Sequence, residues 1–371
     1  MKRRIVLALF CLLGIATNAA FHGPALGLSF RGVTDFISLY CGARLVGTPG
    51  LYNPPRMLEV QKQAAGWSST HRLFCRPPYE AAFLWPVARL PYLQAYAVWQ
   101  ALSIVAVALF VWLWPMGSRA TVAAACCWSY PVFTGLAQGQ DDSFVLAAIA
   151  ASVCLVRASR PFAAGLLFTL CAAKFHLFLL VPFWIVSQRL WRFAGGFVAG
   201  AAALAAISFL AGGPQWPRQY LALLADPATN PSPQAMPNVH GIFAGMPYDL
   251  ALEIVAAAAV AAVAVWSFRR ASFEYGLAMT IGAGLLISRH AFVADCALLI
   301  PGLLVLSVQA KTRAERLFAL AMLAPFVYVG ALTGSTGMAL LRAALACNVA
   351  LLAWIAWRTP APARDAGEIV R

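Results

Sequence analysis

The sequence predicts an all-α polytopic membrane protein, and three observations support this fold class. The chain of 371 residues is 62% hydrophobic and only 11% charged, whereas soluble domains are about one-quarter charged. Its mean hydropathy is +0.76. Apolar stretches recur along the whole chain, which favours membrane-embedded helices. Outer-membrane barrels are excluded, because their strands alternate polar and apolar residues over only about ten positions.

The apolar stretches predict about 12 transmembrane or half-membrane helices. We expect them to form a single integral membrane domain over residues 1–371. The predicted spans are 5–21, 92–114, 120–137, 142–157, 161–174, 175–187, 192–211, 249–268, 275–288, 291–308, 315–333 and 338–357.

The first span has the layout of a secretory signal peptide. Basic residues at Lys2-Arg3-Arg4 precede the apolar stretch, and the small residues at 17–20 offer a cleavage site. Because many apolar stretches follow, we expect the segment to remain as an uncleaved first helix.

The stretches 161–174 and 175–187 allow two topologies. One continuous helix would be long but able to tilt, whereas two separate helices would each be too short for a full crossing. A hairpin of two short helices places more than half of the 27 basic residues on the N-terminal side. The positive-inside rule therefore favours the hairpin, with both termini and the tail 358–371 in the cytoplasm. These residues are Lys2, Arg3, Arg4, Arg119, Arg157, Arg160, Arg189, Arg192, Arg269, Arg270, Lys311, Arg313, Arg316, Arg358, Arg364 and Arg371.

Two long loops lie outside the membrane in this topology, at about 22–91 and 212–248. In the first loop, residues 36–46 have the pattern of an amphipathic helix lying at the membrane surface. The apolar stretch 81–90 is too short to span, so we expect a re-entrant or interfacial helix there. The second loop is rich in Pro, Asn and Gln.

The net charge of +14 does not indicate nucleic acid as a partner, because the basic residues are scattered through short loops. Positive-inside topology and anionic lipid head groups explain the surplus, so membrane lipids are the expected partners.

Most of the cysteines are expected to pack against other apolar residues. All cysteines except Cys41 and Cys75 lie in apolar stretches, where they pack as small hydrophobic residues. Cys41 and Cys75 fall in the first outer loop and would be able to form a disulfide in an oxidising compartment. No Cys/His or carboxylate spacing suggests a metal site, so we expect no metal and no cofactor.

The same topology places the rare polar residues on the outer side. They are Asp35, Gln138, Gln140, Asp141, Asp142, Lys174, His176, Asn230 to His240, Arg289, His290 and Asp295. Ionisable groups near membrane depth are costly, so their concentration on one face indicates a water-filled site. A carboxylate among cations and amides suits transfer chemistry on a phosphorylated lipid.

Simpler roles remain open for each of these residues. Asp35 precedes an apolar run and is a candidate helix N-cap, and capping is the favoured interpretation for Asp141. Lys174 would be able to extend to the interface from a helix end. Ordinary packing or topological roles are alternatives for His176, His290 and Arg289.

Six short motifs follow one another within residues 5–310. They are Thr34-Asp35-Phe36 with Tyr40 and Ala43, Leu51-Tyr52-Asn53-Pro54, Arg76-Pro77-Pro78-Tyr79, Pro86-Val87-Ala88-Arg89-Leu90-Pro91, Gly139-Gln140-Asp141-Asp142 and Lys174-Phe175-His176. In this order they resemble glycosyltransferase family 87, the membrane-embedded polyprenyl-phosphate-sugar transferases related to mycobacterial mannosyltransferases.

The resemblance implies a GT-C-type helical bundle with its active site on the outer, periplasmic face of a bacterial inner membrane. It implies inverting transfer of a sugar, a mannose-like hexose or a pentose, from a polyprenyl-phosphate donor to a lipid or glycan acceptor. The donor would be a co-substrate and not a cofactor. The family's acidic first-loop residue maps onto Asp35. Asp142 and Leu177 depart from the family pattern, which favours Asn and Pro there, and residues 288–295 match its late polar motif only loosely.

We expect Asp35 to act as a general base that takes the proton of the acceptor hydroxyl. The departing lipid phosphate needs positive charge and hydrogen-bond donors. The candidates for binding donor phosphate or sugar are Lys174, His176, Arg289, His290, Arg76, Gln138, Gln140 and Asp142. A retaining mechanism would need a second carboxylate, for which Asp142 and Asp295 are candidates.

A transporter or lipid flippase is the alternative function, in which Asp35 and Lys174 would relay protons or bind an anion. Transporters often show internal repeats and interrupted helices near the bilayer midplane. The sequence has no visible repeat and its charged residues gather on one face, so transfer is favoured.

Overall fold

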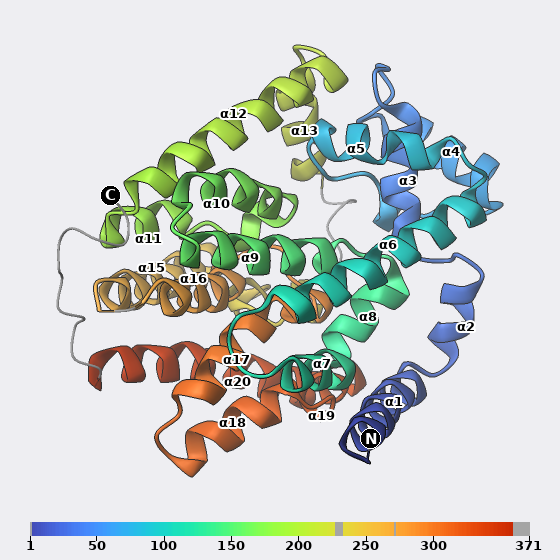
Figure 1. Ribbon diagram of the computed structural model, residues 1–371. Coiled ribbons are helices and arrows are strands. Elements are labelled where there is room, and N and C mark those ends of the chain that lie inside the picture. The colour runs from blue at the N-terminus through green and yellow to red at the C-terminus, as the bar shows by residue number, and fades with distance from the viewer. Residues whose placement is uncertain (1, 227–232, 271, 359–371) are drawn as a thin grey trace.

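The computed structural model describes residues 2–226, 233–270 and 272–358, and every regular element within them is a helix (Figure 1). The predicted all-α polytopic fold class is therefore confirmed. The helices are α1 (Lys2–His22), α2 (Pro24–Phe30), α3 (Phe36–Leu45), α4 (Pro54–Ala65), α5 (Pro78–Ala88), α6 (Tyr92–Leu113), α7 (Arg119–Trp128), α8 (Tyr130–Gln138), α9 (Asp142–Arg157), α10 (Pro161–Phe168), α11 (Val181–Gln188), α12 (Trp191–Gly212), α13 (Trp216–Ala225), α14 (Val239–Phe243), α15 (Asp249–Phe268), α16 (Phe273–Ile287), α17 (Ile300–Gln309), α18 (Arg313–Leu323), α19 (Phe326–Thr333) and α20 (Ser335–Arg358). The 3₁₀ segments of the described residues are η1 (Thr70–Arg72), η2 (Thr169–Leu177), η4 (Pro233–Ala235) and η5 (Ala294–Leu299).

Among the described residues, five helices are long and apolar enough to cross a membrane, namely α1, α6, α12, α15 and α20. The predicted spans 120–137 and 315–333 are each broken, because α7 meets α8 at 65° and α18 meets α19 at 54°. Pro131 is the second residue of α8, and Pro325 lies in the break between α18 and α19. Pro325 disfavours the helical conformation at Ala324, which is extended and ends α18. Counting each bent pair as one span raises the total to seven.

The segment 161–187 is not one helix but consists of α10, the 3₁₀ segment η2 and α11. A Cβ on Gly196 of α12 would lie 1.9 Å from the carbonyl oxygen of Phe162, and one on Gly200 would lie 2.3 Å from the Thr169 hydroxyl. Residues later in the first helix therefore contact residues later in the second, so α10 and α12 run parallel. Small residues allow them to pack at close spacing. The chain must therefore turn back through α11, which confirms the hairpin interpretation.

Several basic loops meet at one end of the bundle. Arg157 at the end of α9 donates to Glu274 at the start of α16 (2.8 Å). The neighbouring Tyr275 hydroxyl donates to a carbonyl near the end of α20 (2.8 Å). Arg358, the last residue of α20, donates to Glu315 of α18 (2.6 Å). These contacts gather the loops after α9, α15 and α17, as the loop-charge pattern predicts, while residues 359–371 of the expected tail lie outside the described part of the chain.

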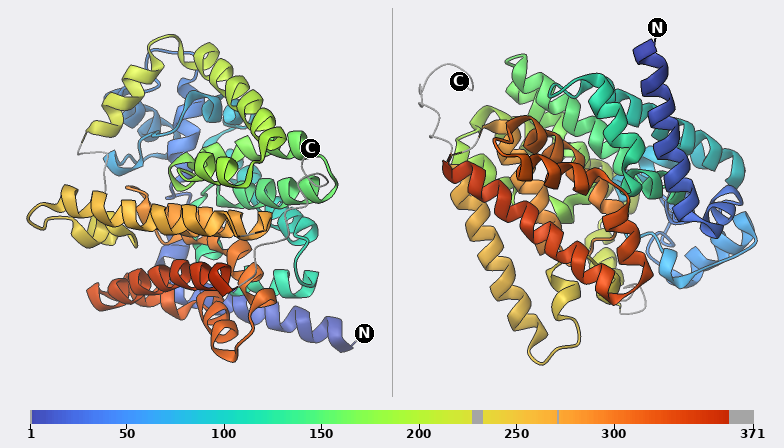
Figure 2. Two further views of the ribbon diagram at one scale, coloured as in Figure 1. Left: turned by 90° about the vertical axis from the view of Figure 1, so that its left-hand side faces the viewer. Right: turned by 90° about the horizontal axis from the view of Figure 1, so that it is seen from below.

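The apolar core is divided in two. The larger core joins α6 to α12 with α15 to α20, and the smaller core joins α3, α4, α5, the start of α6 and α13. Figure 1 shows the smaller core's helices gathered at one corner. Figure 2 shows α12, α15 and α20 stacked across one side of the bundle and α1 at its edge.

The first outer loop is more folded than its pattern predicts. The helix expected at 36–46 is α3, which packs on α5 and buries most of its residues in the protein, so its apolar face lies against other helices. The helix expected at 81–90 is α5, which contacts α12 and leaves Phe83 and Trp85 exposed. In the second loop, Tyr220 and Leu223 of α13 join the smaller core, and residues 227–232 lie outside the described chain.

Candidate active site

Asp35 immediately precedes α3, yet its carboxylate does not cap that helix. Oδ1 accepts a hydrogen bond from Arg72 Nε, and Oδ2 accepts one from Gln140 Nε2, both at 2.8 Å. The side chain remains 37% exposed. The capping alternative is therefore wrong, and Asp35 is a carboxylate fixed at both oxygens and open to solvent.

The turn between α8 and α9 brings Gln140 to Asp35. Gly139 ends α8 in the left-handed conformation (φ 69°), which glycine adopts without strain. A Cβ on Gly139 would lie only 2.8 Å from the Cβ of Phe36. The glycine therefore lets the turn pack directly against the start of α3, where Gln140 reaches the carboxylate.

Lys174 lies behind Gln140 in a buried ionic cluster. Its dihedral angles (φ −118°, ψ 39°) interrupt η2, and its side chain is 4% exposed. Nζ lies 2.6 Å from Asp295 Oδ1, 3.2 Å from Asp142 Oδ1 and 3.4 Å from Asp141 Oδ1. It also donates to Gln140 Oε1 (3.4 Å). The ammonium is thus enclosed by the protein's own carboxylates and not presented to solvent.

Arg76 closes the cluster on the side of the smaller core. Its Nη1 and Nη2 lie 2.9 Å and 3.1 Å from the two oxygens of Asp141, and Nη1 donates to the Ala173 carbonyl. Asp141 makes no capping hydrogen bond to α9, so the capping interpretation is wrong for this residue too. Burial alone would raise the pKa of Asp141, but Arg76 and Lys174 hold it below its ordinary value.

Glu80 of α5 lies at the edge of the same cluster, 3.9 Å from Arg76. Burial raises the pKa of Glu80 to about 8, although Arg76 opposes the shift. Burial therefore favours the neutral form of this carboxyl group, and Arg76 favours the charged form.

The resulting network joins the two cores, because Asp35, Arg72, Arg76 and Glu80 come from the first outer loop and the other members come from the bundle. The carboxylates of the network differ sharply in their solvent exposure. Asp35 is 37% exposed, whereas Glu80, Asp141, Asp142 and Asp295 are each at most 10% exposed. A ligand in solvent can therefore reach Asp35 and no other carboxylate of this network.

Other predicted site residues lie beside the network or away from it. His176 and His290 pack edge to face with ring centroids 5.7 Å apart, and His290 is exposed. The Oε1 atom of Gln138 is buried at the end of α8. Arg289 is not part of the network, because its Nε pairs with Glu253 (3.0 Å).

Cys41 and Cys75 are free thiols, so the disulfide that the sequence allowed is not formed in this structure. Burial raises the pKa of the Cys41 thiol to about 12 and that of Cys75 to about 11. Across residues 2–226, 233–270 and 272–358, His, Cys, Asp and Glu side chains form no group able to hold a metal ion.

Sequence reasoning missed Arg72 and Glu80 as members of the site. Each carried a signal, since Glu80 is one of only 13 acidic residues and stands in an apolar helix. Arg72 lies four residues before Arg76, in the same outer loop as Asp35. An arginine in that loop is within reach of the Asp35 carboxylate. Asp295 was named only as a possible second carboxylate, and it proves to be the nearest partner of Lys174.

Comparison with known families places the matched region over the site. The family model for glycosyltransferase family 87 matches residues 74–295. The matched region is more than half of the chain and contains Arg76, Gln140, Lys174 and Asp295, while Asp35 and Arg72 precede it. No curated protein and no solved structure gives a significant match.

Proposed function

Because this chain belongs to glycosyltransferase family 87, we propose that it transfers a sugar from a polyprenyl-phosphate donor to a hydroxyl of a lipid or glycan acceptor. The sugar is a mannose-like hexose or a pentose. Transfer takes place at the outer face of a bacterial inner membrane and inverts the anomeric centre. Family membership and five membrane-length apolar helices support a membrane glycosyltransferase.

The exposure of Asp35 is the observation that carries the mechanism. A general base must come within about 2.6–3.2 Å of the hydroxyl it deprotonates, and Asp35 is the network carboxylate that solvent reaches. Asp35 takes the acceptor proton as the acceptor oxygen bonds to the anomeric carbon. The bond from that carbon to the phosphate oxygen breaks, and the lipid phosphate leaves with the electron pair.

Positive charge for the leaving phosphate comes from Arg72 in this proposal. Arg72 is 29% exposed and binds Asp35 through Nε, so it stands beside the reacting centre. Preorganised donors of this kind stabilise the charge that develops as the bond breaks. The exposed His290, whose ring packs edge to face on His176, is the second candidate.

Lys174 and Arg76 have an anchoring role rather than the donor-binding role expected for them. The ammonium and the guanidinium already face carboxylates inside the protein. Lys174 holds Gln140, and Gln140 in turn holds Asp35. The buried cluster thereby fixes the orientation of the base from behind.

The positions of charge along the helices support an outer location for the site. Asp142 begins α9 within the network, whereas Arg157 ends α9 among the basic loops. The network and the basic loops therefore lie at opposite ends of this helix. Since short basic loops face the cytoplasm, the network faces the other side.

We predict that the purified protein in lipid will glycosylate an acceptor from a polyprenyl-phosphate sugar. The assay presents a panel of polyprenyl-phosphate hexoses and pentoses with a membrane lipid extract, and mass spectrometry identifies the product by the added sugar mass. Nucleotide sugars serve as the control donors. Transfer from nucleotide sugars alone would contradict the donor class, and solute uptake into proteoliposomes without any sugar donor would favour the transporter alternative.

A further inference from the structure

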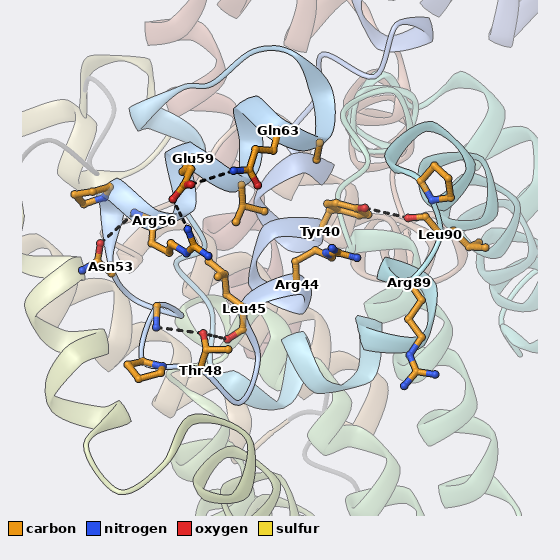
Figure 3. A pocket seen from close by; sticks show the side chains of 16 residues that line it. Tyr40, Arg44, Leu45, Thr48, Asn53, Arg56, Glu59, Gln63, Arg89 and Leu90 are labelled. Carbon is orange, nitrogen blue, oxygen red and sulfur yellow. Dashed lines mark hydrogen bonds and ion pairs between the residues drawn. The ribbon is translucent and has the colours of Figure 1, made fainter.

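A separate groove lies on the surface of the smaller core, between α3, α4 and the end of α5 (Figure 3). Its volume is about 970 Å³, which is ample for a ligand of head-group size. The residues that give it its character are Tyr40, Arg44, Asn53, Arg56, Arg89 and Pro91. The lining is mixed, with polar and charged side chains beside apolar ones such as Leu45 and Leu90, and the groove is open on one side.

The groove is distinct from the candidate active site. Tyr40 and Arg44 are one helical turn apart and share a face of α3, whereas Asp35 lies about 140° around the helix from Tyr40. The Tyr40 hydroxyl donates to the Leu90 carbonyl (3.0 Å) and joins this face to the end of α5. None of the residues that line the groove belongs to the Asp35–Lys174 network.

Two arginines of the groove carry uncompensated positive charge. Arg44 donates to the Ala88 carbonyl at 3.4 Å, and Arg89 lies over the Trp85 ring at 3.8 Å. Within the described parts of the chain, no carboxylate lies within ion-pair distance of either guanidinium. Arg56 differs, because it pairs with Glu59, the acidic residue of the groove lining. The groove therefore favours an anion.

The apolar surroundings indicate where that anion comes from. Phe83 and Trp85 of α5 and Leu93 of α6 are exposed next to Arg89 in the chain. The candidate membrane span of α6 begins at Tyr92, directly after the groove residue Pro91. Aromatic residues and arginines in this arrangement are typical of the level of lipid head groups.

We propose that this groove binds the phosphate of an anionic membrane lipid, whose acyl chains lie along the exposed face of α6. Arg44 and Arg89 contact the phosphate, and the polar wall at Asn53 contacts the head group. The bound lipid holds the first outer loop at the membrane surface and is not a substrate.

Native mass spectrometry of the protein exchanged into detergent with phosphatidylglycerol tests this proposal. Wild-type protein is expected to retain phosphatidylglycerol in preference to phosphatidylcholine. The double variant Arg44→Gln/Arg89→Gln is expected to lose about tenfold or more in retention, because each cation near the surface contributes to anionic-lipid binding. The single variant Arg89→Gln is compared with the control Arg218→Gln, which changes an exposed arginine of α13 outside the groove. The control variant should retain the lipid as wild type does.

Three outcomes would overturn the proposal. The first is unchanged phosphatidylglycerol retention in the double variant. The second is equal binding of water-soluble glycerol phosphate, which would make the ligand a free phosphate. The third is specific displacement of phosphatidylglycerol by polyprenyl phosphate with loss of transfer, which would assign the groove to the donor.

Discussion

Asp35→Asn is expected to lower kcat for sugar transfer by about 10²–10⁴-fold, the range that general-base catalysis contributes. The amide has the size of the carboxylate and still offers an oxygen to Arg72, but it cannot take a proton from the acceptor. Donor binding should therefore remain close to that of wild type. Initial rates at saturating donor, together with donor binding measured on the same preparation, check this expectation.

Asp249→Asn is the matched control for this substitution, because Asp249 is an exposed acid at the start of α15 that lies outside the network. Its transfer rate should stay within about twofold of wild type, as for most surface changes. A folded Asp35→Asn protein with wild-type turnover would remove Asp35 from the mechanism.

Lys174→Met is expected to destabilise the protein by about 3–5 kcal/mol, because it removes one partner of a buried ionic cluster. Three carboxylates, on Asp141, Asp142 and Asp295, would lose their shared ammonium. The free energy of unfolding in mixed detergent micelles measures the effect.

Lys62→Met on α4 is the control for Lys174→Met, since Lys62 is exposed and its replacement should cost no more than about 0.5 kcal/mol. The double variant Lys174→Met/Asp295→Asn should recover part of the loss, because it removes both members of the closest pair. An unfolding free energy equal to that of wild type in Lys174→Met would contradict the anchoring role.

The fold class and the arrangement of the basic loops were predictable from sequence. Apolar stretches of membrane length identify helices such as α6 and α12 without any knowledge of their neighbours. Loop charge also selected the hairpin at 161–187, because membrane topology sorts arginines to one side. The bends at Pro131 and Pro325 had a local signal in the prolines themselves, which a hydropathy pattern does not register.

The burial of α3 was not predictable in the same way. Its pattern identifies an apolar face, but lipid tails and protein interiors are both apolar. Sequence alone therefore does not distinguish a helix lying on a membrane from one packed on α5.

Which residues of the site contact each other was also not predictable from the sequence. The rare charge at Lys174 was recognisable, but its nearest partner, Asp295, lies 121 positions away. The same applies to Asp35 and Gln140, which are 105 positions apart. Such contacts depend on how distant helices are arranged, so residues expected to bind the donor proved to be bonded to the protein's own carboxylates.

The stereochemistry of transfer tests the central claim most directly. One reachable carboxylate implies a single displacement, since a retaining mechanism would normally need a second carboxylate at the reacting centre. Nuclear magnetic resonance of the glycosylated product, compared with the donor of known anomeric configuration, gives the outcome. Inversion is the predicted result, and retention would contradict a mechanism in which Asp35 acts alone as the base.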